Sequence, residues 1–217
     1  LYLAASNVDR ARLGEEGART RVDLLTPLAK AYGTDIGCEV ASIGIQIHGG
    51  MGFVEETGAA QHYRDARIAP IYEGTNGIQA ADLVGRKLTG DGGAGMATLI
   101  ADVRAEAEDA RLIALTHLVE KLTAHLLEVD VDDRLAASYP YLTMVSVMTC
   151  GWLMERQARI ATALLAKGEG DPAFLKQKQV TAHYYLTHLV GEALGLAGSV
   201  TAGAEGLYDL SAEDLAA

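Results

Sequence analysis

The chain has 217 residues, of which 49% are hydrophobic and 22% are charged. A compact chain of this length buries on the order of 70% of its unfolded surface, so it needs neither a disulfide nor a metal for stability. Its formal net charge of −11 lacks the basic footprint that binding to nucleic acid or to an anionic membrane requires, and we expect neither partner. The two cysteines, Cys38 and Cys150, lie far apart in the sequence, which favours either a reducing, cytoplasmic environment or two buried thiols over a secreted disulfide framework.

The sequence indicates neither a signal peptide nor a membrane span. Asp9, Arg10 and Arg12 come too early for the apolar core of a signal peptide. The stretch 139–154 is uncharged, but it contains a proline and several hydroxyl side chains and is too short to cross a bilayer. Because the first residue is Leu1 rather than methionine, we expect the chain to be part of a longer protein.

The first half of the chain is predicted to be helical, because good helix formers dominate and strand-like alternation is scarce. A first helix is expected from residue 3 to about residue 14. A break follows at 23–27, where Pro27 suits the first turn of a second helix, 28–48. Apolar residues recur along this second helix at spacings of three and four, which predicts one buried face. These residues are Ile36, Val40, Ile43 and Ile47.

A glycine run follows the second helix in the segment 46–53, QIHGGMGF. Two interpretations fit this run. Glycines stop a helix, because they adopt backbone conformations that other residues avoid. Glycines also let the backbone approach a ligand, and freed backbone N–H groups can hold a phosphate. The pattern of glycines leaves both interpretations open.

A carboxylate occupies the segment 71–76, IYEGTN, before the next helix. We expect 67–72 to be extended, because Pro70 disfavours helical geometry at the residue before it. Thr75 or Asn76 is then expected to cap a helix that continues to about residue 88. Glu73 is either a general base near that helix start, with room for a substrate beside it, or an acid that complements the helix dipole.

The second half of the chain is also predicted to be helical. A glycine-rich linker at 90–95 precedes three long helices and a short acidic helix capped by Ser211. Pro140 is expected to kink the second of these helices or to reset its start. The long helices are predicted at 96–128, 132–167 and 171–200. No two histidines have metal-binding helical spacing and no cysteine is near a histidine, so we expect no metal site.

Three motifs, in their order and spacing, resemble the C-terminal helical domain of acyl-CoA dehydrogenases. They are QIHGGMGF (46–53), YRDARI (63–68) and IYEGT (71–75). The resemblance covers residues 1–90, and residues 91–217 resemble the additional helical domain of a long-form branch of this family. It implies an all-α fold, with an up-down helical bundle at 1–90 that is incomplete at its start, followed by a second helical domain at 91–217.

The resemblance implies a flavoenzyme that introduces a double bond next to the thioester of an acyl-CoA. Glu73 would remove the α-proton while a hydride leaves the β-carbon for N5 of FAD. Tyr72 would line the acyl pocket, and Gly74 would keep space open beside the thioester. The backbone N–H of Glu73 would help to bind the thioester oxygen, which gains negative charge as the proton leaves.

The resemblance also implies how the flavin is held. Gln46 and Gly50 match positions that hold the adenine–pyrophosphate portion of the FAD of a neighbouring subunit, which implies a homo-oligomer, either a dimer or a tetramer. Thr75 matches another FAD contact. Gly77 departs from the glutamine that is common at its position, and Asn76 is an alternative contact there. The implied electron acceptor is an electron-transfer flavoprotein.

Two other functions are compatible with the sequence. An acyl-CoA oxidase would use the same Glu73 base but would pass its electrons to oxygen, so that peroxide release would distinguish it from a dehydrogenase. A helical interaction or oligomerisation domain would carry out no chemistry. In that domain Glu73 would be a solvated residue on an outer face.

The flavin site that the resemblance implies is only half present in this chain, because other domains of the family build most of the flavin and CoA sites. We therefore expect the 217-residue chain alone to bind FAD weakly and to turn over no substrate. A titration of the purified chain with FAD measures this. Stoichiometric tight binding would contradict the expectation.

Overall fold

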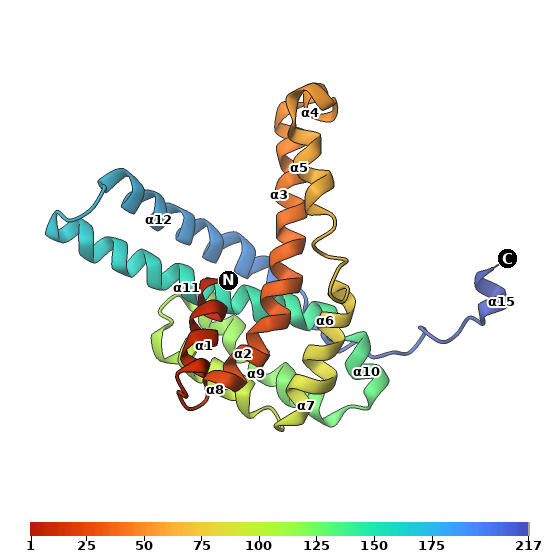
Figure 1. The fold of residues 1–217 in the computed structure, drawn as a ribbon. Helices are drawn as coiled ribbons and strands as arrows, with labels where there is room; N and C mark the ends of the chain where they lie inside the picture. Colours follow the sequence, from red (N-terminus) through yellow and green to blue (C-terminus); the bar gives the residue numbers. More distant parts are fainter. Residues whose placement is uncertain (217) are drawn as a thin grey trace. The chain divides into compact units, whose positions relative to one another are not determined.

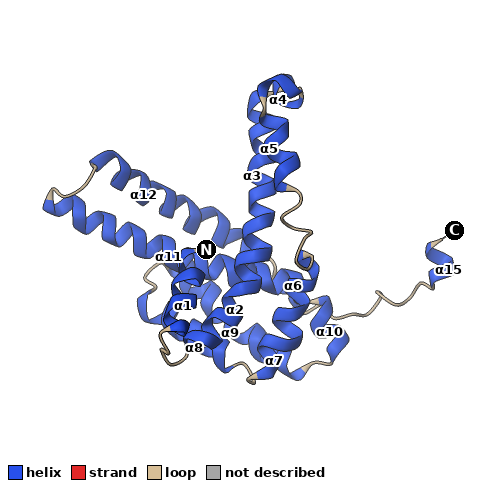
Figure 2. Cartoon of the chain, viewed as in Figure 1, coloured by secondary structure: helices blue, strands red, loops and turns tan. Residues whose placement is uncertain are grey.

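The computed structural model describes residues 1–216, and its regular elements are helices (Figures 1 and 2). The described part of the chain contains no strand, so the predicted all-α class is confirmed. None of the described helices combines the length and the apolarity that a membrane span requires. The chain divides into two compact units, a first unit from Leu1 to Lys87 and a second unit from Leu88 onward.

The first unit contains a long helix, α3, that lies beside the shorter α5, with α4 at the end that joins them (Figure 1). Its elements, including the π-helical turns η1 and η3 and the 3₁₀ turn η2, are α1 (Tyr2–Arg12), α2 (Ala18–Pro27), η1 (Leu28–Tyr32), α3 (Gly33–His48), α4 (Gly50–Phe53), η2 (Glu55–Thr57), α5 (Ala59–Ala66), α6 (Asn76–Asp82) and η3 (Leu83–Lys87).

The expected break at 23–27 is wrong. Pro27 is helical and ends α2, and the chain passes directly through the π-helical turn η1 into α3. The break lies earlier, at Gly14 and Gly17, whose φ angles of 79° and 75° are in the left-handed region that favours glycine. A proline near the end of a helix signals a lost hydrogen bond but does not by itself stop the chain from continuing.

The predicted end of the long helix at His48 is confirmed, but its predicted buried face is wrong. Val40, Ile43 and Ile47 are exposed, at 60%, 48% and 79%. Cys38 is the buried residue of α3. Helical spacing identifies an apolar stripe, but burial of the stripe depends on what packs against it. The packing of α5 on α3 leaves these three side chains of the stripe exposed.

The segment expected to be extended, 67–72, instead forms consecutive turns. The N–H of Ala69 donates to the carbonyl of Ala66 (3.1 Å), and that of Ile71 donates to the carbonyl of Ile68 (3.0 Å). Pro70 lacks an N–H and so ends helical bonding, but its neighbours satisfy their own backbone groups in turns.

The second unit is built around α11, which packs against α9 and α12. Large side chains with almost no exposed surface fill its core, among them Leu112, Leu115, Tyr141, Met144 and Met148. Its elements are α7 (Leu88–Gly90), α8 (Ala94–Glu106), α9 (Ala110–Glu128), α10 (Val131–Ala136), α11 (Ser138–Lys167), α12 (Pro172–Tyr184), the π-helical turn η4 (Tyr185–Leu189), α13 (Val190–Leu194), α14 (Ala197–Val200) and α15 (Ala212–Leu215).

Local signals in the second unit are confirmed, whereas the predicted helix lengths are not. Pro140 lies in the first turn of α11, which starts afresh after α10. Asp171 accepts a hydrogen bond from the N–H of Ala173 as the cap of α12, and Ser211 caps α15. The helix predicted at 96–128 is broken into α8 and α9, and the helix predicted at 171–200 is broken before α14.

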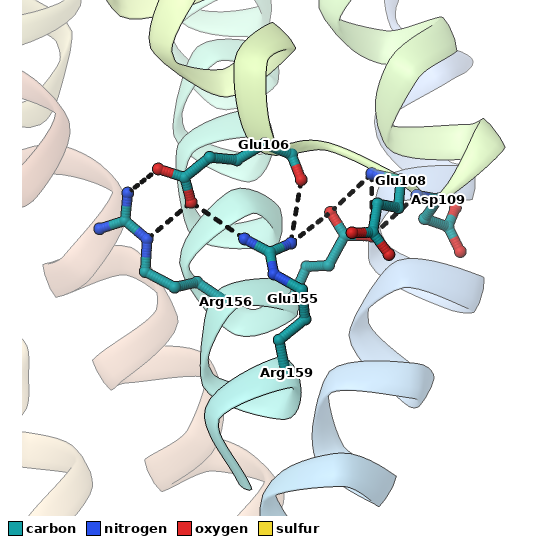
Figure 3. A network of polar contacts seen from close by, with 6 residues as sticks. All are labelled: Glu106, Glu108, Asp109, Glu155, Arg156 and Arg159. Carbon is teal, nitrogen blue, oxygen red and sulfur yellow. Dashed lines mark hydrogen bonds and ion pairs between the residues drawn. The ribbon is translucent and has the colours of Figure 1, made fainter. Parts of the chain in front are cut away.

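The break between α8 and α9 is held by a buried carboxylate on α11 (Figure 3). Glu155, only 7% exposed, accepts hydrogen bonds from the backbone N–H groups of Glu108 (3.2 Å) and Asp109 (2.7 Å). Arg159 donates to the backbone carbonyl of Glu106 (2.9 Å). The Arg156 guanidinium pairs with the Glu106 side chain and lowers the pKa of that carboxyl. We call the contacts of Glu155 with these two N–H groups the Glu155 clamp.

We expect Glu155→Ala to lower the free energy of unfolding of the second unit by about 1–3 kcal/mol, because it leaves two backbone N–H groups without a partner. Glu120→Ala is the matched control, since Glu120 pairs with Arg104 on the surface and such pairs contribute about 0–1 kcal/mol. Chemical denaturation followed by circular dichroism measures both changes. Equal losses in the two variants would contradict the role of the clamp.

Candidate active site

The predicted catalytic segment forms a closed loop between α5 and α6. At its end, the N–H of Asn76 donates to the carbonyl of Pro70 (3.0 Å). At its start, the N–H of Tyr72 donates to the carbonyl of Ile68 (3.1 Å). Thr75 caps α6 by accepting a hydrogen bond from the N–H of Ile78 (3.4 Å), which settles the choice of cap between Thr75 and Asn76. We call residues 70–76 the Glu73 loop.

Glu73 has an unusual backbone conformation. Its φ is 55°, and in the described part of the chain it is the only non-glycine residue with a positive φ. Gly74 follows with a φ of 88°. A left-handed conformation costs a residue with a side chain about 1–2 kcal/mol. Such strain persists only where the surrounding structure imposes it, and it concentrates at functional sites.

Both functional groups of Glu73 are available to a ligand. The residue is exposed, and within the described residues its carboxylate makes no hydrogen bond or ion pair and its backbone N–H has no acceptor. Its carbonyl accepts a weak hydrogen bond from the Gln79 side chain (3.4 Å). Tyr72 and Gly74, the two predicted substrate contacts, are exposed on either side. Arg64 does not occupy the carboxylate, because it pairs with Glu55 instead.

Asn76 is buried and its side-chain amide is fully used inside the first unit. The residue is only 5% exposed. Its nitrogen donates to the Ala31 carbonyl and to Thr34 and Asp35, and its oxygen accepts from Lys30. These contacts occupy the amide inside the first unit, which disfavours the interpretation of Asn76 as an alternative FAD contact. The sequence offered no signal for these contacts, since the partners lie more than forty residues earlier.

The predicted flavin contacts Gln46 and Gly50 lie at the turn between α3 and α4. Gly49 ends α3 with a φ of 62°, as a helix stop requires. Both Gln46 and Gly50 are exposed, and a side chain on Gly50 would have no neighbour within 4 Å. At Gly52, in contrast, a Cβ would stand 2.3 Å from the carbonyl oxygen of Ile45. Gly52 thus allows the tight turn, because a side chain there would not fit, and Gly50 leaves open space at the surface of the turn.

The Glu73 loop and the α3–α4 turn are separate sites on the first unit. Asn76 ties the loop to Asp35 near the start of α3. Gln46 lies eleven residues further along this helix, which corresponds to roughly 16 Å along its axis. The residues predicted to act on the substrate and those predicted to hold the flavin of a neighbouring subunit are therefore not brought together within one chain. Thr75, the third predicted flavin contact, belongs to the Glu73 loop.

The described residues contain no group of three or more histidine, cysteine or acidic side chains that could hold a metal ion. Burial raises the pKa of the Cys150 thiol. Cys38 donates its S–H to the carbonyl of Ala66. Unlike these thiols, the carboxylate of Glu73 is exposed and has no partner in the described part of the chain.

Comparison with known proteins places both halves of the chain in one family. Residues 3–89 match the family model described as acyl-CoA dehydrogenase, C-terminal domain. Residues 92–211 match the model described as acetyl-CoA dehydrogenase C-terminal like.

Individual relatives agree with these matches. A 3-methylmercaptopropionyl-CoA dehydrogenase of Ruegeria pomeroyi is 41% identical over 209 residues, which cover 85% of this chain and 34% of that protein. A broad-specificity linear acyl-CoA dehydrogenase of Mycobacterium tuberculosis is 31% identical over 75% of this chain and 30% of that protein. The human mitochondrial short-chain specific acyl-CoA dehydrogenase is 46% identical over 28% of this chain and 15% of that protein. The chain thus spans about a third of the length of the first of these relatives, and it belongs to the acyl-CoA dehydrogenase family.

Proposed function

We propose that this chain is the C-terminal part of an FAD-dependent acyl-CoA dehydrogenase and that Glu73 is its catalytic base. The observation that carries the proposal is the left-handed backbone of Glu73 together with a carboxylate and an N–H that have no partner in the described chain. Membership of the family supports the reaction class. The proposed domains are a helical bundle at 1–90 and an appended helical domain at 91–217.

The proposed reaction needs a carboxylate and a hydrogen-bond donor close to each other. The α C–H of a thioester is weakly acidic, so the base must come within about 3 Å of it. Exclusion of water by a bound substrate raises the pKa of a carboxyl group and strengthens it as a base. The thioester oxygen gains negative charge as the proton leaves, and a preorganised N–H such as that of Glu73 contributes about 3–4 kcal/mol to stabilising it.

The neighbours of Glu73 fit this role. Gly74 has no side chain to occupy the space beside the thioester, and its φ of 88° is one that glycine adopts without strain. Tyr72 presents an exposed aromatic ring on the other side of Glu73, suited to line an acyl pocket. In this arrangement Glu73 holds the proton that leaves the α-carbon.

The residues proposed to hold FAD are accessible. Gln46 is exposed with no side-chain partner in the described chain, and Gly50 has open space beside it. Thr75 uses a lone pair to cap α6 and keeps its hydroxyl hydrogen for a donor role. When bound, FAD supplies the acceptor for the hydride that leaves the β-carbon.

The distance between the two sites supports a shared flavin arrangement in a homo-oligomer. Gln46 lies roughly 16 Å along α3 from Asp35, the residue that Asn76 of the Glu73 loop contacts, and this separation suits contacts of Gln46 and Gly50 to the flavin of a neighbouring subunit. The exposed apolar stripe of Val40, Ile43 and Ile47 supports a covering contact on the same helix. An electron-transfer flavoprotein is the proposed acceptor of the electrons.

We expect Glu73→Gln in the flavin-loaded full-length enzyme to bind acyl-CoA but to lose activity on the order of 10²–10⁴-fold or more, because the amide cannot accept the α-proton. Anaerobic loss of flavin absorbance on mixing with acyl-CoA measures the step. Glu56→Gln, at an exposed glutamate of η2, is the matched control and should behave as the unmodified enzyme. Normal flavin bleaching in Glu73→Gln would rule out the proposed base.

A second measurement separates the dehydrogenase from an oxidase that uses the same base. We expect the reduced enzyme to transfer its electrons to an electron-transfer flavoprotein and to release little peroxide in air. This is the second arm of the same experiment, and abundant peroxide would favour the oxidase.

A further inference from the structure

We propose that Asn76 is a positioning residue, which with Lys30 anchors the Glu73 loop so that Glu73 keeps its strained, reactive conformation. The inference rests on the proposed function for the role of Glu73, but the anchoring itself is a property of the fold. The buried amide of Asn76 is the strongest attachment between the loop and the helix beneath it.

The contacts of Asn76 are short and fully satisfied. The side-chain nitrogen shares its two hydrogens among the Ala31 carbonyl (3.0 Å), Thr34 Oγ1 (2.9 Å) and Asp35 Oδ1 (2.8 Å). The side-chain oxygen accepts from Lys30 Nζ (2.7 Å). A buried amide whose polar atoms are all hydrogen-bonded avoids the penalty of an unsatisfied group and holds its residue in one place.

The same residue also closes the Glu73 loop. The backbone N–H of Asn76 donates to the carbonyl of Pro70 (3.0 Å), so the loop's closure and its attachment to α3 meet at one residue. The side-chain hydrogen bonds of the neighbouring residues are longer, at 3.4 Å for both the Gln79 side chain and the Thr75 cap. The left-handed conformation of Glu73 needs an external constraint, and Asn76 supplies the buried side-chain part of it.

The partners of Asn76 lie on an unusual element. Lys30 and Ala31 belong to the π-helical turn η1, directly before α3. Single π-helical turns inside helices are uncommon and are frequently found at functional sites. Here the turn presents a cation and a backbone carbonyl to the same amide, and through both groups it holds the end of the Glu73 loop.

The chemistry of the partners fixes the orientation of the amide and suggests a sharp variant. An ammonium group only donates and therefore faces the amide oxygen, whereas a carboxylate and a carbonyl only accept and face the nitrogen. Asn76→Asp keeps the shape but sets a carboxylate against Asp35 and the Ala31 carbonyl. Adding Asp35→Asn restores a donor opposite the new carboxylate while Lys30 still faces it.

The first experiment tests anchoring by hydrogen exchange of the 217-residue chain. In Asn76→Asp, we expect the backbone amides of Tyr72 and of position 76 to exchange at least about tenfold faster while the helices stay protected. Asn7→Asp is the matched control, because Asn7 is also buried but donates to Leu3 within its own helix. Unchanged exchange in the Glu73 loop would overturn the anchoring role.

The second experiment tests positioning in the flavin-loaded full-length enzyme with acyl-CoA deuterated at the α-carbon. We expect Asn76→Asp to lower kcat per bound flavin on the order of 10- to 100-fold, as a small misplacement of a base does. KM should change little, the isotope effect should increase, and Asp35→Asn should recover part of the loss. Simple loss of folded protein would lower the bound flavin but leave kcat per flavin and the isotope effect unchanged.

The outcomes separate the two proposals. A normal kcat and isotope effect in Asn76→Asp, together with an inactive Glu73→Gln, would overturn positioning by Asn76 and leave the catalytic base intact. A fully active Glu73→Gln, together with faster exchange in Asn76→Asp, would refute the proposed function and leave the anchoring role standing.

Discussion

The buried amide of Asn76 is the interaction on which the arrangement of the first unit's candidate site depends. It joins the start of α6 to the π-helical turn before α3, two elements that lie far apart in the sequence. Without this junction the Glu73 loop would be attached to the fold mainly through turns and long hydrogen bonds. A strained residue needs a rigid frame, and the frame here consists of one amide and the donors and acceptors around it.

Both units use a buried polar side chain where regular α-helical bonding changes, at a break in the second unit and at a π-helical turn in the first. Helix ends leave backbone groups without partners, and burial of these groups is costly. In the second unit, the carboxylate of Glu155 receives the N–H groups freed at the start of α9. In the first unit, the amide nitrogen of Asn76 donates a hydrogen bond to the carbonyl of Ala31 in the π-helical turn η1. Polar side chains buried by neighbouring helices thus allow breaks that helix propensity alone would not predict.

Local signals in the sequence predicted local features, because they act over a few residues. Thr75 caps a helix, Gly49 ends one, and Pro140 lies in the first turn of one. The predictions that failed depend on partners distant in the chain. Periodicity could not tell that Val40 is exposed, and helix-forming residues at 96–128 could not reveal a break imposed by Glu155.

The candidate site shows the same limit. Its motif identified Glu73 through resemblance, since a carboxylate between tyrosine and glycine is a local pattern. Its left-handed backbone and the anchoring contacts of Asn76 arise only when α6 packs against η1 and α3. A carboxylate exposed to water is a weak base for an α C–H, so the proposed reaction requires that this loop be covered when substrate is bound. Covering a freely moving carboxylate would add an ordering cost to each binding event, whereas an anchored one is already in place. Because Asn76 anchors the loop, the free-energy cost of ordering the Glu73 carboxylate is met when the chain folds rather than each time substrate binds.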